Sequence, residues 1–254
     1  MALDMSKMRA KLDNLQGRGD GKKSNFWRPK DGEQTIRIVS PADGDPFKDY
    51  HFHYLEVNGM RQSVLCPKKN FGDACPICEF ASSLYREGTP ESIKQAKSLF
   101  ARQRFFSPVL VRGEEEMGVR IWGYGKMAYE SLLNLVLNPD YGDITDTEDG
   151  TDLNVIYGKP QGASFPQTKI QPRRRTSPLC DEAVGGPDKC AELLENIPEF
   201  DNLFERKTQG EVEKILDSYL NDDNSEEQSS ETVKYNNTES ASNVEKAFEE
   251  LVGA

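Results

Sequence analysis

The sequence predicts a mainly β fold with inserted helices, an α+β chain organised around a small open barrel rather than a parallel sheet. Three observations support this class. Short runs of strand character follow one another between residues 26 and 178, two helical patterns interrupt them, and residues 221–243 contain almost no apolar groups. A chain of 254 residues has room for one sizeable domain or two small ones.

The predicted strands are short and bounded by turn residues. Residues 34–40 alternate apolar and polar side chains, which is the pattern of a half-buried strand. Residues 50–57 and 61–66 flank Asn58-Gly59, the strongest short signal for a β-hairpin. The remaining strand-like runs are residues 104–112, 117–125, 151–158 and 166–172.

Two helices are predicted among these strands and two beyond them. Thr89 and Pro90 form an N-cap and first-turn pair that opens a helix over residues 91–103. Pro139 ends a second helix over residues 127–138. Further along the chain the pattern becomes mostly helical, over residues 190–197 and 211–220.

Charge is unevenly distributed along the chain. The net charge is −11, yet residues 221–254 hold nine acids and two bases, and residues 22–126 hold 17 bases against 13 acids. The chain is a mildly basic body followed by an acidic tail, so its net charge does not exclude a polyanionic partner. No apolar run reaches the ~18 residues of a membrane span, and residues 1–20 lack the apolar core of a signal peptide. We therefore expect a soluble, intracellular protein with no membrane role.

The two ends of the chain have patterns of their own. Residues 1–24 combine near-helical apolar spacing with scattered bases, which fits a frayed terminus, a helix that docks on a partner, or a basic arm for nucleic acid. Residues 221–243 are predicted to be disordered. Beyond them an apolar stripe on one helical face is predicted to fold against a protein partner, and it includes Val244, Phe248 and Leu251.

Metal-ligand residues are concentrated in one short segment. Cys75 and Cys78 form a C-x2-C knuckle, Cys66 lies upstream, and both histidines of the chain, His51 and His53, precede it. Three cysteines and one histidine complete the tetrahedral shell of a structural Zn²⁺. The two histidines are two residues apart on a strand and point to the same face, so either could be the fourth ligand. One alternative is that the C-x2-C spacing arises by chance and the histidines lie on the surface. A redox-active cysteine pair is disfavoured because no βαβ unit surrounds it.

The other cysteines carry no metal pattern. Five cysteines are too few, and odd in number, for a secreted disulfide scaffold. Cys180 and Cys190 have no histidine nearby and are predicted to be plain thiols.

Two strand-like segments interleave cations with aromatic side chains. Such faces bind single-stranded nucleic acid because bases stack on the aromatics, for ~1–3 kcal/mol each, while cations follow the phosphates. The alternative is that these aromatics are core residues. The candidate contacts are Arg102, Arg104, Phe105 and Phe106 on the first segment and Arg120, Trp122, Tyr124 and Lys126 on the second, with Arg37 as a weaker candidate.

One further basic cluster lies between two prolines. Arg173, Arg174 and Arg175, followed by Thr176 and Ser177, would bind phosphate or capture an acidic segment of this or a neighbouring chain. The alternative is a solvated linker that closes the domain.

The spacing His53-x12-Cys66-x8-Cys75-x2-Cys78 closely resembles the zinc signature of the single-stranded DNA-binding, helix-destabilising proteins of T-even-type bacteriophages. Other features occur in the same order, namely the segment FWRPKDGEQTIRIVSP, the Asn-Gly hairpin, the basic and aromatic junction at residues 102–106, and the acidic tail. Motifs carry the resemblance over roughly residues 1–178, and composition carries it over the tail.

The resemblance implies a domain organisation. Residues 1–24 would be a basic arm for self-association, residues 25–220 an OB-fold core with a five-stranded barrel and a zinc subdomain at about residues 50–103, and residues 221–254 an acidic tail for protein partners. It implies His53 rather than His51 as the ligand of one structural Zn²⁺ per chain. A compact basic run of the kind that the family carries in its arm occurs here at residues 173–177, so residues 1–15 and residues 173–177 both remain candidates for driving cooperativity.

The resemblance also implies a function. The protein would coat and protect single-stranded DNA with little sequence preference, and remove its secondary structure, during phage replication, recombination and repair in the cytoplasm of the infected bacterial host. Its expected partners are single-stranded DNA, further copies of itself bound cooperatively, and phage replication proteins such as a polymerase, helicase loader, primase or recombination mediator.

Two other functions fit parts of the pattern. A zinc-ribbon adaptor would bind protein through its acidic tail and would not bind DNA. A zinc-dependent nucleic-acid enzyme is disfavoured because a shell of three cysteines and one histidine leaves no open position. The chain also has no P-loop, nucleophile–base pair or His-x-Glu deaminase motif. We therefore expect no enzymatic activity.

Overall fold

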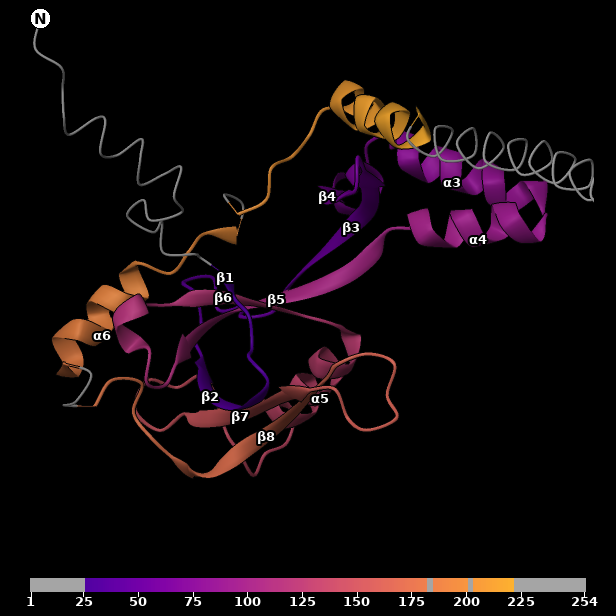
Figure 1. Ribbon diagram of the computed structural model, residues 1–254. Helices are drawn as coiled ribbons and strands as arrows, with labels where there is room; N and C mark the ends of the chain where they lie inside the picture. The colour runs from indigo at the N-terminus through magenta and orange to yellow at the C-terminus, as the bar shows by residue number, and fades with distance from the viewer. Residues whose placement is uncertain (1–25, 182–184, 201–202, 222–254) are drawn as a thin grey trace, which may run out of the picture. The chain divides into compact units, whose positions relative to one another are not determined.

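The computed structural model describes residues 26–181, 185–200 and 203–221, which form a mainly β structure with helices (Figure 1). These residues divide into two compact units. The first, called the sheet unit, contains residues 26–50 and 103–205. The second, called the knuckle unit, contains residues 51–102 and 206–221. Strands β3 (Lys48–Val57) and β5 (Arg102–Val111) both cross from one unit to the other.

The sheet unit is built on one path of hydrogen-bonded strands. All neighbours in it pair antiparallel except β1 and β6, which are parallel. The strands expected in this region are confirmed. β1 was not expected, because a strand of two residues is too short to show a period. The order along the path is β1 (Phe26–Trp27), β6 (Arg120–Tyr124), β5, β2 (Gly32–Ile38), β7 (Thr151–Gly158) and β8 (Gln167–Thr176).

The central strand β5 is covered on both faces. Val109 and Val111 belong to one apolar cluster, and Leu110 between them belongs to another. Helix α5 (Lys126–Val136), predicted at 127–138, adds Ala128 and Leu132 to the first cluster. Helix α6 (Gly186–Glu195), predicted at 190–197, adds Leu193 to the second. Both faces of the middle of this sheet are therefore buried in apolar clusters.

The knuckle unit begins with the predicted hairpin. Strands β3 and β4 (Met60–Leu65) pair antiparallel with Val57 opposite Met60. Asn58 and Gly59 between them have φ of 52° and 69°, the left-handed values that a two-residue type I′ turn requires at both positions. The hairpin prediction is confirmed.

Helices follow the hairpin in the knuckle unit. They are α2 (Pro67–Phe71), α3 (Pro76–Glu87), α4 (Pro90–Leu99) and the last described helix, over residues 209–221. Only Gly88 and Thr89 separate α3 from α4. The predicted cap of α4 is confirmed, since Thr89 accepts a hydrogen bond from the Ser92 amide. The helix ends at Leu99 rather than residue 103 because β5 begins at Arg102.

Helix α3 was not predicted, since its segment was interpreted only as a metal knuckle. Its buried residues Ile77 and Ala81 pack with the hairpin residues Leu55 and Val64. The helix predicted at 211–220 is confirmed, and it completes the same apolar cluster with Val212 and Leu216.

The prediction that Cys180 and Cys190 are plain thiols is wrong, because the two residues form a disulfide bond. The fold brings their Cα atoms to 5.6 Å, within the range that a disulfide spans. Both half-buried side chains pack beside Leu179 and Leu193, so the bond ties α6 to the segment that follows β8.

The predictions for both chain ends lie outside the described residues. These are the basic arm over residues 1–24, the disordered tail after residue 221, and the partner-binding stripe with Val244, Phe248 and Leu251. Among the helices that the structure describes, none has the length and apolarity to cross a membrane.

A candidate metal centre and a candidate nucleic-acid groove

Four side chains of the knuckle unit converge on one point. His53, Cys66, Cys75 and Cys78 each offer one ligand atom, and these atoms lie within 4.8 Å of one another. The Sγ atoms of Cys66 and Cys78 are 3.5 Å apart, and His53 Nε2 lies 3.4 Å from Cys75 Sγ and 3.5 Å from Cys78 Sγ. The predicted cluster is confirmed, with His53 as its histidine.

The cysteines stand where helices begin. Cys66 is the N-cap residue of α2, and its sulfur accepts a hydrogen bond from the Lys69 amide at 3.3 Å. Cys75 is the N-cap residue of α3, and Cys78 lies in the first turn of that helix. The partial positive charge of a helix N-terminus favours thiolate over thiol. The local fold therefore prepares these sulfurs to act as ligands.

Asn70 fixes the backbone around the first cysteine. Its side-chain oxygen accepts from the His51 amide at 2.9 Å, and its side-chain nitrogen donates to the carbonyls of His51 and Cys66 at 2.8 and 2.9 Å. These bonds tie α2 to strand β3. His51 takes part through its backbone and is not a member of the ligand cluster.

The ring of His53 is held at both nitrogens. It is fully buried, and its Nδ1 lies 2.7 Å from the Leu99 carbonyl oxygen, which can only accept a hydrogen bond. Nδ1 therefore carries a proton, and Nε2, which faces the sulfurs, is the nitrogen that would bind a metal ion. This arrangement, in which a backbone carbonyl orients the histidine, is typical of protein metal sites.

Without a cation, the pKa values of His53, Cys66 and Cys78 are shifted in different directions. Burial acts to lower the pKa of His53, but hydrogen bonds with Cys66, Cys75 and the Leu99 carbonyl outweigh it and raise the pKa to about 9. Contacts with the other two thiols lower the pKa of Cys66 and raise that of Cys78. Three touching thiols cannot all ionise unless a positive charge lies among them.

The donor set fits zinc. Tetrahedral Zn²⁺ with Zn–S bonds of about 2.3 Å and a Zn–N bond of about 2.0 Å requires its ligands to be about 3.5–3.8 Å apart. The Cys66–Cys78 sulfur–sulfur distance and the distances from His53 Nε2 to the sulfurs of Cys75 and Cys78, 3.4–3.5 Å, agree with this to within a few tenths of an ångström. The cluster is a possible metal site, compatible with a structural zinc.

A groove of about 1130 Å³ in the sheet unit has five cations in its lining, and none of the described residues that line it is acidic. Tyr157 and the largely buried Trp122 and Tyr124 also line it. A concave surface of one sign raises the local concentration of the opposite charge. The cations are Arg28 after β1, Arg104 on β5, Lys126 at the start of α5, Lys159 after β7, and Lys169 on β8.

The predicted aromatic face is not an exposed platform, and this part of the prediction is wrong. Trp122, Tyr124, Phe105 and Phe106 are between 1% and 7% exposed. Their strands are covered on both faces, so these aromatic side chains are buried in the core whichever face they lie on. Trp122 and Tyr124 are nevertheless among the residues that line the groove.

Phe106 and Arg120 are structural. The Phe106 ring packs against Phe204, with the ring centroids 4.9 Å apart. It also packs so closely on Gly123 that a Cβ added there would stand only 2.9 Å from the ring atom Cε1. Arg120 is buried and donates to Glu114 at 2.7 Å. Neither residue has the exposure that the predicted contact with nucleic acid requires.

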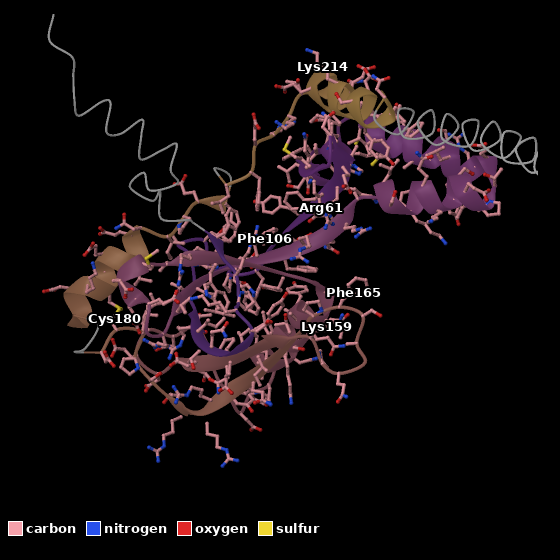
Figure 2. The ribbon with its side chains drawn as sticks, viewed as in Figure 1. Arg61, Phe106, Lys159, Phe165, Cys180 and Lys214 are labelled. Atoms are coloured by element: carbon pink, nitrogen blue, oxygen red, sulfur yellow. A yellow bond between two sulfur atoms is a disulfide. The ribbon has the colours of Figure 1, made fainter. Side chains whose placement is uncertain are left out.

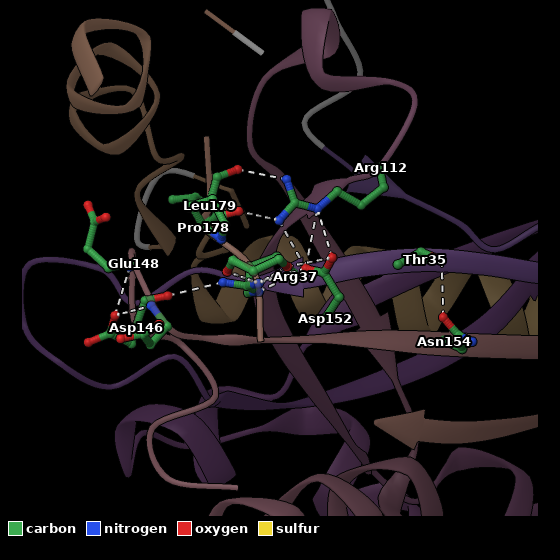
Figure 3. Close-up of polar contacts among 11 residues, drawn as sticks. Thr35, Arg37, Arg112, Asp146, Glu148, Asp152, Asn154, Pro178 and Leu179 are labelled. Carbon is green, nitrogen blue, oxygen red and sulfur yellow. Dashed lines mark hydrogen bonds and ion pairs between the residues drawn. The ribbon is translucent and has the colours of Figure 1, made fainter. Parts of the chain in front are cut away.

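Arg37 is also not a surface contact, because it is fully buried in an ion-pair network (Figure 3). Its Nε donates to Asp152 at 2.9 Å, and its Nη atoms donate to the backbone oxygens of Asp146 and Ser177. Arg112 binds the same carboxylate from the other side at 3.0 Å. Burial lowers the pKa of Arg37, although Asp152 opposes this.

The remaining predicted cations are accessible. Arg104 and Lys126 line the groove, and Arg102 is exposed in the knuckle unit. Arg173, Arg174 and Arg175 are exposed on strand β8, so the alternative of a linker is wrong. Their binding role stays a prediction.

Three groove cations were missed by sequence reasoning: Arg28, Lys159 and Lys169. Lys159 and Lys169 have no neighbouring cation to mark them, whereas Arg28 follows Phe26 and Trp27, a local cation and aromatic pattern that could have identified it. The signal that could have found Lys169 is the alternation along β8, where Gln167, Lys169 and Gln171 are exposed and the residues between them are half-buried.

In comparisons of the sequence with known protein families and with curated proteins, no family and no protein matched.

Proposed function

We propose that this protein binds single-stranded DNA in the groove of the sheet unit and holds one structural zinc in the knuckle unit. The observation that carries the proposal is the groove itself, which gathers five cations from five separate segments and no acid among its described lining residues, in a chain whose net charge is −11. Cations concentrated against the sign of the whole molecule favour a specific polyanionic ligand.

The lining favours a single strand over a duplex. Tyr157 is half-exposed among the cations, so a base can contact an aromatic ring while phosphates contact lysine and arginine. In a duplex the bases are stacked on one another and offer no free face. The antiparallel strands and the covering helix are compatible with an OB-fold, the fold that the sequence resemblance implies.

The zinc role is structural in this proposal. His53, Cys66, Cys75 and Cys78 fill all four positions of a tetrahedral ion, which leaves none for substrate or catalytic water. The metal would hold the hairpin, α2 and α3 together. Binding rather than catalysis is the proposed activity.

The wider role follows the resemblance. The protein would coat single strands in phage replication, recombination and repair within the bacterial host, and copies would bind side by side through residues 1–15 or the basic run at 173–177. The nine acids of residues 221–254 would compete with DNA for the basic groove at low salt, as a tethered mimic of the phosphate backbone. The stripe with Phe248 would recruit replication proteins.

The test is a titration with oligo-dT, followed by the fluorescence of Trp122 and the tyrosines of the groove and repeated at several salt concentrations. We expect quenching, with an affinity that falls linearly on a log–log plot against salt. Absence of binding at low salt, with the protein folded and zinc-loaded, would favour the zinc-ribbon adaptor instead. Binding that is equally tight to duplex DNA would contradict the single-strand preference.

A further inference from the structure

The loop between β7 and β8 carries the most exposed aromatic side chain that the structure describes, Phe165 at 78%. We propose that Phe165 stacks on an unpaired base at the rim of the basic groove and gives the groove its preference for single strands. The inference rests on the proposed function and assigns a specificity residue to it.

The loop borders the groove on both sides of Phe165. Lys159 and Pro160 before it, and Pro166 directly after it, line the groove, while the phenylalanine itself projects into solvent. Figure 2 labels Lys159 and Phe165 on this loop of the sheet unit. A planar apolar ring is therefore carried by the same loop as a groove cation that can hold a phosphate of the bound strand.

The backbone of the loop is ordered around Phe165 before any ligand binds. The Ala163 amide donates to the Pro160 carbonyl at 3.0 Å, and Gly162 has φ of +83°, so residues 160–163 form a turn with a left-handed glycine. Pro166 restricts the backbone of the preceding Phe165 to extended conformations. A preordered loop loses little conformational entropy on binding.

Charge decides which ligand fits the ring. Five cations line the groove and no described acid does, although Lys126 also pairs with the exposed Glu130 at 3.5 Å, so the lining repels a basic partner and attracts a polyanion. Of the polyanions, a single strand presents planar faces next to its phosphates, whereas a duplex presents phosphates and closed stacks. The exposed ring therefore matches a single-stranded nucleic acid, and the cations alone would not distinguish the two forms.

The test compares Phe165→Ala with Leu137→Ala in the full-length, zinc-loaded protein. Leu137 is equally exposed at 77%, lies at the end of α5 in the same unit, and does not line the groove. We expect Phe165→Ala to weaken binding to oligo-dT roughly 5- to 150-fold, the equivalent of ~1–3 kcal/mol for one stacked base, with the salt slope unchanged. Leu137→Ala should bind as the parent does.

Two further ligands make the outcome specific to stacking. An abasic oligodeoxyribose phosphate and a duplex of equal length should each bind the parent and Phe165→Ala equally, since neither offers a free base. Equal losses on oligo-dT and on the abasic strand would overturn the proposal, because the ring would then not contact bases.

A second variant reports the contact directly. Phe165→Trp keeps a stacking ring and adds an exposed indole to a unit whose own Trp27 and Trp122 are buried. Its additional emission should be quenched by oligo-dT and not by the abasic strand. If oligo-dT binds the variant and this emission does not change, Phe165 is not a base contact, while the proposed function stands. If the parent protein binds no oligo-dT at all, the proposed function fails first.

Discussion

The imidazole Nδ1 of His53 donates a hydrogen bond to the Leu99 carbonyl across 2.7 Å. Leu99 is the last residue of α4, so the end of that helix orients the histidine of the metal cluster. The bond fixes the ring tautomer and turns Nε2 towards Cys75 and Cys78. The ligand geometry is thereby linked to the segment where α4 gives way to β5.

Replacing one sulfur ligand should remove the metal and loosen the knuckle unit. We expect one Zn²⁺ per chain in the parent, and Cys75→Ser should lose it and lower the melting temperature of this unit, because metal binding contributes to the folding free energy. Elemental analysis and calorimetry measure the two effects. Cys190→Ser is the matched control, since it removes a cysteine outside the cluster and should keep the metal. Full zinc content in Cys75→Ser would contradict the assignment.

Asp152→Ala should strongly destabilise the sheet unit. The carboxylate lies between Arg37, which is fully buried, and Arg112, so its removal leaves two guanidinium groups without their shared counter-charge. Breaking a buried ion pair on one side costs ~3–5 kcal/mol. Urea denaturation measures the loss. Glu130→Ala removes only an exposed pair with Lys126 and should cost less than about 1 kcal/mol. Comparable losses in the two variants would contradict the structural importance of the network.

Gly150→Ala should disturb the same network by steric overlap. A Cβ at this position would stand 2.5 Å from Arg37 Nη1 and closer still to the Asp146 carbonyl oxygen. We expect a loss of at least ~2 kcal/mol in the free energy of unfolding, as for other overpacked sites. Gly210→Ala is the control, because a Cβ there meets nothing within 4 Å in the last helix. It should be neutral or stabilising by ~0.5–1 kcal/mol. A stable Gly150→Ala protein would show that the loop can move aside.

Single groove cations should contribute to binding through phosphate contacts. Lys159→Ala and Lys169→Ala should each reduce the log–log salt slope for oligo-dT by about 0.7 while leaving thermal stability unchanged, since both side chains are exposed. Lys214→Ala, on the last helix and outside the groove, should leave the slope as it is. An unchanged slope in both groove variants would show that DNA binds outside the groove, and the exposed arginines of β8 would be the next candidates.

The sequence was informative where the signals are local. The hairpin follows from two residues that tolerate left-handed conformations, Asn58 and Gly59, and the ligand cluster follows from residues brought together by that hairpin and one knuckle. The choice of His53 over His51 came from the resemblance. In the structure, only His53 joins the cluster.

Sequence reasoning failed where burial depends on distant elements. A two-residue period shows that Arg120, Trp122 and Tyr124 share a face, but it does not show that other elements cover that face. Arg37 was judged as a possible surface cation because its partner Asp152 is 115 residues away in the chain. The groove was only partly visible for the same reason, since its cations come from five separate segments.

Residues 51–102 of the knuckle unit are inserted within the sequence of the sheet unit, and this order has a consequence for biosynthesis. The metal ligands span only residues 53–78 and are complete early in translation, whereas β2 pairs with β7 more than 100 residues later, with Ile36 opposite Leu153. Local contacts form faster than distant ones. At ~5–20 residues per second, the nascent chain would have several seconds to acquire its ion before the sheet can close. Val212 and Leu216 arrive later still, so a helix far downstream of the metal ligands completes the apolar cluster of the unit that begins to fold first.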